Sequence, residues 1–283
     1  MHRLSARATL ALLFAAPVAA HATEITAGTA EFITARDCAG GATSPCDLVS
    51  PIVASQFGGN GGAYSSAATA TFGGYGTASG SVSLSGTLGA PVLHASASSL
   101  ADKRTNSNSI ALQSYTYTGA APTTRTFGGT LTYNQFETGL YQDNTGVYAT
   151  IEAFTLTAAA IDVGSTPSDN FYTLFNDDFS AEGYSLVAQM TYSDTSSNAS
   201  GAGSFGVDVP LTPGETIWLR VLLQTPAANG SYVDASHTLV TGWSDGSDLT
   251  PAVTSLPVPE PAPFALFGLG LAALAVAQRR RAR

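Results

Sequence analysis

Basic residues are scarce in this 283-residue sequence, which has 11 Lys and Arg against 20 Asp and Glu and a formal charge of −9. Six of the basic residues lie near the two ends. Residues 23–257 therefore keep five basic residues against 19 acidic ones, a formal charge of −14. A surface this acidic repels phosphate backbones and anionic membranes. The composition thus excludes nucleic acid as an expected partner.

Cysteine and histidine are also rare, which limits metal and redox chemistry. Cys38 and Cys46 are the only cysteines, and a redox or zinc motif would need a second pair of ligands. We predict a disulfide bond that closes the Gly/Pro loop between them, the usual state of a cysteine pair in an oxidising compartment. Beyond residue 22 only His94 and His237 remain, too few for a zinc site unless carboxylates complete it.

Helical hydrophobic stripes of useful length are missing from residues 23–257, where short alternating runs are separated by Gly, Ser, Asn, Asp and Pro. The clearest run is 216–224, in which the odd positions from 217 to 223 are Ile, Leu or Val. Further candidate strands are 81–88, 126–136, 147–156, 184–192 and 236–243. The pattern predicts one all-β domain, a jelly-roll-like β-sandwich.

Residues 58–89 form a Ser-, Gly- and Ala-rich stretch that allows two interpretations. It is either a set of strands in the sandwich or a poorly packed surface hairpin. The second interpretation stays open because side chains this small bury little apolar area.

Residues 1–22 predict a secretory signal peptide. Arg3 and Arg7 come first, an apolar run covers 8–20, and Ala20-His21-Ala22 supplies a small-residue cleavage site. The apolar run is too short for an ordinary membrane span. We therefore expect export and cleavage after Ala22, which leaves 23–257 as an ectodomain.

The C-terminal segment, residues 258–283, has three parts. Val258-Pro259-Glu260-Pro261 is followed by an apolar run over 262–277, and the segment ends with Arg279, Arg280, Arg281 and Arg283. As a helix the apolar run would be about 24 Å long. The positive-inside rule places the arginines in the cytoplasm. These features predict one C-terminal hydrophobic helix that anchors the protein, with the ectodomain outside.

In order, spacing and terminal position this segment resembles the PEP-CTERM sorting domain of Gram-negative bacteria. The resemblance implies recognition of Pro259-Glu260-Pro261 by an exosortase, loss of the hydrophobic tail, and association with exopolysaccharide or biofilm matrix. The protein would then pass transiently through the inner membrane to the cell surface or matrix. Such tails are also labelled ice-binding protein C-terminal domains, a label that concerns the tail alone. A plain single-pass anchor is the alternative.

The ectodomain carries no motif that predicts catalysis. Residues 242–246 match G-x-S-x-G, but a nucleophile elbow needs a following helix and a later histidine, and neither follows Ser244. Asp234, Ser236 and His237 are close in sequence. In a regular strand, however, His237 would point to the opposite face from Asp234 and Ser236. We therefore expect a protein that is not an enzyme and needs no cofactor.

Calcium is the one metal that the sequence suggests. Candidate loops are residues 176–178, Asp194 with Asn198, and Asp245 with Asp248. None of them has the spacing of a recognisable calcium loop, so solvated turns are the favoured interpretation.

Aromatic residues raise the question of sugar binding. Trp218 and Trp243 could stack on sugar rings, although aromatics in strands more often belong to the core. The favoured hypothesis is a non-enzymatic structural or adhesive protein linked to exopolysaccharide. The alternatives are a polysaccharide-binding module and a secreted polysaccharide hydrolase.

Overall fold

The computed structural model describes residues 27–37, 47–58, 64–85, 88–138, 145–156, 184–196 and 198–251. The predicted signal peptide, the two cysteines, residues 176–178 and the C-terminal tail with its predicted helix lie outside them. The described residues form strands and turns and no helix. Accordingly, none of them belongs to a helix long and apolar enough to cross a membrane.

Alternating sequence becomes strand throughout the described part of the chain, as predicted for an all-β protein. The candidate strands 126–136, 147–156, 184–192, 216–224 and 236–243 all lie within observed strands, whereas 81–88 begins later than its strand. The strands are β1 (Ala27–Asp37), β2 (Asp47–Gly58), β3 (Tyr64–Phe72), β4 (Gly76–Ser85), β5 (Ala90–Ser99), β6 (Lys103–Tyr117), β7 (Thr123–Phe136), β8 (Val147–Leu156), β9 (Tyr184–Asp194), β10 (Ser200–Leu211), β11 (Thr216–Ala228), β12 (Tyr232–Trp243) and β13 (Leu249–Pro251).

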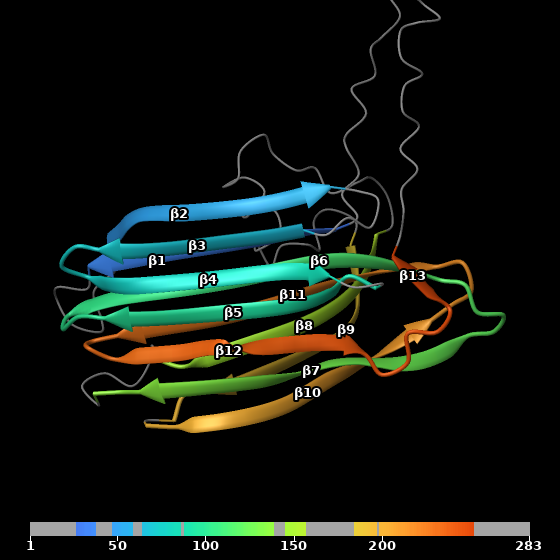
Figure 1. Cartoon of the computed structure of the whole chain (residues 1–283). Helices are drawn as coiled ribbons and strands as arrows, with labels where there is room; N and C mark the ends of the chain where they lie inside the picture. The colour runs from blue at the N-terminus through green and yellow to red at the C-terminus, as the bar shows by residue number, and fades with distance from the viewer. Residues whose placement is uncertain are drawn as a thin grey trace, which may run out of the picture.

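The strands form two antiparallel sheets that lie face to face (Figure 1). Sheet A has the order β2-β1-β6-β11-β8-β9, with β13 on β6, and sheet B has the order β10-β7-β12-β5-β4-β3. β5 pairs with β12, β6 with β11, β7 with β10 and β8 with β9. Strands β5 to β12 thus pair as one long hairpin wrapped across both sheets, which is the jelly-roll topology. The predicted jelly-roll-like sandwich is confirmed.

The first four strands widen the jelly roll along one side. β1 and β2 extend sheet A beyond β6, and β4 and β3 extend sheet B beyond β5. Ala68, Ala70, Ala78 and Val82 are buried in the main core. The stretch 58–89 therefore contributes strands to the sandwich and is not a surface hairpin, because its alternating small side chains pack against the opposite sheet.

The β1–β2 ladder continues to the ends of both strands, where Asp37 and Asp47 are cross-strand partners. The Cα atoms of such partners are about 4.5–5.5 Å apart. Cys38 follows Asp37 and Cys46 precedes Asp47 in the sequence; both cysteines lie outside the described residues, and the disulfide stays a prediction.

The core lies between the sheets, and sheet A is also buried on its outer face along β6 and β11. Ile217, Leu219, Val221 and Leu223 face the core, as their alternation predicted. On the other side of β11, Arg220 is buried as well and pairs with Glu152 on β8. Arg220 Nε donates to Glu152 Oε2 at 2.5 Å, and Gln189 Nε2 donates to Glu152 Oε1 at 2.9 Å.

A carboxyl group on β1 is buried between the sheets. Glu31, on β1, has no exposed surface, and a Cβ atom at Gly80 of the opposite sheet would overlap its Oε2 atom. The nearby Ser109 hydroxyl donates its proton to the His94 carbonyl oxygen at 2.7 Å, and neither carboxyl oxygen of Glu31 has a hydrogen-bond partner among the described residues. Burial therefore raises the pKa of Glu31 well above its ordinary value.

Candidate functional site

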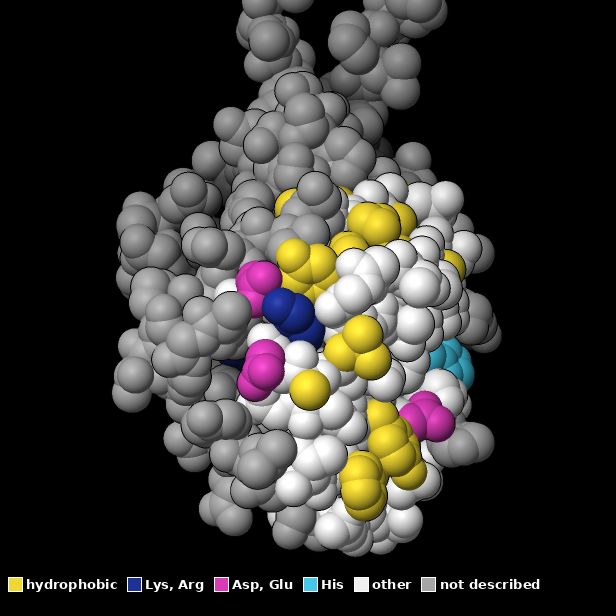
Figure 2. Space-filling model, turned by 90° about the vertical axis from the view of Figure 1, so that its left-hand side faces the viewer, with side chains coloured by type: hydrophobic (Ala, Val, Ile, Leu, Met, Phe, Trp, Pro, Cys, Tyr) yellow, Lys and Arg dark blue, Asp and Glu magenta, His cyan; other side chains and the backbone are white. Residues whose placement is uncertain are grey.

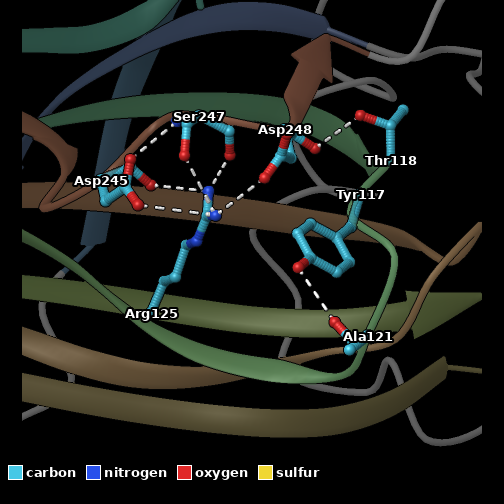
Figure 3. Close-up of polar contacts among 7 residues, drawn as sticks. All are labelled: Tyr117, Thr118, Ala121, Arg125, Asp245, Ser247 and Asp248. Atoms are coloured by element: carbon cyan, nitrogen blue, oxygen red, sulfur yellow. Dashed lines mark hydrogen bonds and ion pairs between the residues drawn. The ribbon is translucent and has the colours of Figure 1, made fainter.

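The G-x-S-x-G residues 242–246 lie at the end of β12 and in the loop that follows, and Arg125 of β7 holds this loop (Figure 3). Arg125 Nη1 donates to the carbonyl oxygens of Asp245, at 3.1 Å, and of Ser247. Its Nη2 donates to Ser247 Oγ at 3.2 Å. The guanidinium carbon also lies 5.4 Å from the centre of the Tyr117 ring. These contacts fix the backbone of the loop against β7, and the G-x-S-x-G residues therefore belong to a structural turn.

The same guanidinium contacts both carboxylates of the third candidate calcium loop. Arg125 Nη2 is 3.5 Å from Asp245 Oδ2 and 3.4 Å from Asp248 Oδ2. The Ser247 backbone amide, and to a lesser extent the Arg125 charge, lowers the pKa of Asp245 below its ordinary value. A calcium ion held by these two carboxylates would have to displace Arg125.

The second candidate calcium loop is closed by its own hydrogen bonds. The Ser196 amide donates to Asp194 Oδ1 at 2.8 Å, and the Tyr133 hydroxyl donates to Oδ2. Burial acts to raise the pKa of Asp194, but hydrogen bonds from Ser196 and Tyr133 together lower it below its ordinary value. Among the described residues, no group of three or more His, Cys, Asp or Glu side chains is placed to hold a metal ion.

Both tryptophans have packing roles. Trp218 is buried on sheet A and stacks on Phe154, with ring centres 6.3 Å apart. Trp243 packs edge-on against Tyr115 and Phe127, at 5.5 and 5.2 Å. Neither tryptophan belongs to the exposed aromatic pair on the outer face of sheet B.

That pair is Phe136, at the end of β7, and Tyr232, at the start of β12. The two residues are cross-strand partners, their rings stack with centres 6.0 Å apart and planes 18° apart, and they are 44% and 37% exposed. Asn134 Nδ2 donates to the Tyr232 hydroxyl at 3.2 Å, and Ser200 Oγ donates to Asn134 Oδ1 at 3.1 Å. Stacked exposed aromatics beside a hydrogen-bonded amide form a fixed surface for a ligand that has both apolar and polar faces.

Two residues further along β12, the ladder is interrupted. Ala235 pairs with Ala95 and Leu239 pairs with Leu93, so β12 has two more residues than β5 between these pairs. Thr238 takes φ = +105° there, which is strained for a β-branched residue. The alternation assumed for Asp234, Ser236 and His237 therefore does not apply across this bulge.

Asp234 and His94 anchor the bulge. The Ser236 amide donates to Asp234 Oδ1 at 2.9 Å, and His94 Nδ1 lies 2.6 Å from the Ser236 carbonyl oxygen. Because a carbonyl oxygen only accepts, Nδ1 carries the proton and Nε2 is left as an acceptor in the neutral ring. Of the three residues that are close in sequence, Asp234 and Ser236 thus meet in the structure through the backbone of the bulge, and their partner there is His94.

Around this pair and bulge, the outer face of sheet B is covered with small hydroxyl side chains. Several pair across strands, as in Ser79 Oγ to Ser96 Oγ at 2.7 Å and Thr130 Oγ1 to Ser204 Oγ at 3.3 Å. Figure 2 shows one end of the sandwich, where the described hydrophobic side chains form separate groups among uncharged side chains and backbone, with a few charged side chains between them. The outward-facing hydroxyl residues include Ser65, Thr69, Thr71, Thr77, Ser79, Ser81, Ser83, Ser96, Ser98, Thr126, Thr130, Thr132, Ser200 and Ser204.

Residues 257–281 match the family model of the PEP-CTERM protein-sorting motif. The predicted resemblance of the tail is confirmed, and the protein is therefore exported and sorted by an exosortase, with membrane-anchored transit before processing. Comparison with curated proteins returned no match, and comparison with solved structures returned none. The matched motif lies outside the jelly roll, so the function of the jelly roll is inferred from its own surface.

Sequence reasoning missed the Phe136–Tyr232 pair because the two residues are far apart in the chain. Tyr232 lies just after the Asn229-Gly230 turn and Phe136 ends a Thr-rich strand, and both signals are visible in the sequence. Only the pairing of β7 with β12, two strands that are distant in the sequence, places them together.

Proposed function

We propose that this protein is a non-enzymatic adhesive component of the cell surface or extracellular matrix of a Gram-negative bacterium. In this proposal a signal peptide starts export, an exosortase processes the tail, and the jelly roll binds exopolysaccharide through the outer face of sheet B. The stacked and exposed pair of Phe136 and Tyr232 is the observation that carries the proposal. Jelly rolls serve many functions, so the fold alone would not support it.

Sugar rings combine apolar C–H faces with hydroxyl edges, and the outer face of sheet B offers partners for both. The Phe136 and Tyr232 rings provide apolar area that is already ordered by stacking, so little side-chain entropy is lost on binding. Asn134 and the surrounding Ser and Thr hydroxyls can exchange hydrogen bonds with sugar hydroxyls.

Packing and hydrogen-bonding roles for the candidate reactive residues support a binding role over catalysis. Arg125 fixes the G-x-S-x-G loop, Asp234 accepts the Ser236 amide, and both tryptophans pack within the fold. Each of these side chains already has a structural task.

The test is co-sedimentation of the protein with insoluble exopolysaccharide from the producing cells. Tyr232→Ala should weaken binding about tenfold, equivalent to about 1.4 kcal/mol, because one aromatic contact is lost. Val240→Ala is the matched control, since Val240 is an exposed apolar residue on the same face of the same strand. It should bind as the unaltered protein does.

Two results would contradict the proposal. Equal binding by Tyr232→Ala and the unaltered protein would remove the aromatic pair from the interface. Release of reducing ends from the polymer would indicate the hydrolase alternative instead.

A further inference from the structure

We propose that the polysaccharide bound on this face carries free amino groups. This inference rests on the proposed function and adds the chemical class of the ligand. It follows from the charges that surround the Phe136–Tyr232 pair and from the position of Asp234 beside it.

The ionisable carboxylates on the outer face of sheet B are Asp208 on β10 and Asp234 on β12, in the part of the sheet that the structure describes. Asp208 lies near the far end, where Thr126 Oγ1 donates to its Oδ1 at 2.6 Å. Asp234 is two residues from Tyr232 on the same side of β12 and is the cross-strand partner of Asn134. A polymer seated on the aromatic pair therefore meets a carboxylate next to the rings.

No lysine or arginine compensates these carboxylates on the described outer face of sheet B. Arg125 is on β7 but contacts the loop after β12. The other four basic residues of the ectodomain are on strands of sheet A: Arg36, Lys103, Arg104 and Arg220. A polyanion such as a uronic acid polymer would be repelled at this face, whereas a polymer with ammonium groups would be attracted.

Asp234 is positioned to accept from such a group. Its Oδ1 atom accepts the Ser236 amide, which fixes the carboxylate in place, and Oδ2 has no partner among the described side chains. An ammonium group on a sugar that stacks beside Tyr232 can donate to Oδ2 as a charge-assisted hydrogen bond.

The experiment compares three soluble hexasaccharides by titration calorimetry with the protein recovered from its producing cells. The first is a glucosamine hexamer with free amines, the second its N-acetylated form, and the third a uronic acid hexamer. The amine hexamer should bind about two- to fivefold more tightly than the acetylated one, the range of a solvent-exposed ion pair. This preference should shrink in high salt. The uronic acid hexamer should bind most weakly.

Asp234→Asn is the diagnostic variant, because asparagine Oδ1 can still accept the Ser236 amide and keep the bulge in place. It should bind the amine and acetylated hexamers equally. Asp208→Asn is the matched control, with the same charge change on the same face, and it should keep the preference for the amine.

The outcomes separate this inference from the proposed function. Equal binding of all three hexamers by the unaltered protein would overturn the inference and leave the polysaccharide-binding role intact. Equal loss of preference in both Asp variants would overturn the role of Asp234. Absence of binding to every hexamer and to the native exopolysaccharide would overturn both.

Discussion

Replacing Glu31 by glutamine is expected to stabilise the protein at neutral pH and to change its stability little near pH 4. Glu31 is buried between the sheets against Gly80, and in the described part of the chain neither carboxyl oxygen has a hydrogen-bond partner. The pKa of Glu31 is raised mainly because burial disfavours the charged carboxylate. Glutamine has nearly the same shape and remains neutral at every pH.

The way in which the stability depends on pH follows from proton linkage. Because the folded-state pKa of Glu31 is higher than the unfolded-state value of 4.5, the folded protein holds this proton more tightly. The resulting stability is fully present below about pH 4.5 and is lost as the pH rises through the folded-state pKa. Each unit by which the folded-state pKa of Glu31 is raised corresponds to about 1.4 kcal/mol of unfolding free energy that the unaltered protein loses at high pH. For a domain of this size, each kcal/mol changes Tm by about 2–4 °C.

The measurement is thermal unfolding of the unaltered protein and of Glu31→Gln at intervals from pH 4 to pH 8. Other carboxylates titrate in both proteins, so the difference in Tm isolates Glu31. That difference should grow with pH in favour of the variant. Asp208→Asn, at an exposed position, serves as the control for a simple loss of negative charge. Parallel curves for the unaltered protein and Glu31→Gln would refute the reasoning.

Three further outcomes are expected. Arg220→Ala should lower the unfolding free energy by about 3–5 kcal/mol in urea titration, because it leaves Glu152 buried without its cation; an unchanged midpoint would contradict this. Non-reducing peptide mass spectrometry should recover Cys38 linked to Cys46, and Cys46→Ser should cost about 2–3 kcal/mol for a loop of this length; a free thiol at either position would argue against the bond. Mass spectrometry of the C-terminus should find a mature chain without residues 264–283, whereas an intact basic end outside the inner membrane would count against processing.

Local patterns were sufficient to predict the fold class. The alternation in β11 identified the core face of Ile217, Leu219, Val221 and Leu223, because a strand with period two must bury one side. The same pattern did not show that Trp218 and Arg220 on the opposite side are also buried, since that depends on what covers sheet A. The C-terminal tail could be identified without knowledge of the fold, because its sorting motif is contiguous in the sequence.

The candidate site depends on contacts that sequence alone does not specify. Phe136 and Tyr232 meet through pairing between distant strands, and the β12 bulge breaks the alternation from which the orientation of His237 was predicted. The burial of Glu31 was equally hidden, because its position opposite Gly80 depends on how the two sheets are stacked. Non-local pairing, bulges and sheet stacking are properties of the assembled sandwich.

The position of β13 has a mechanical consequence. This strand pairs with the last residues of β6, at the end of the sandwich opposite Phe136 and Tyr232 (Figure 1). The 13 intervals along β7 from Thr123 to Phe136 amount to about 40 Å. In the proposed adhesive role, a force between a polymer bound at the aromatic pair and the C-terminal side of the chain would thus run along β12, through the loop held by Arg125, and into β13. The covalent backbone of β12 lies along that line, and its ladders with β7 and β5 hold the strand in place on both sides.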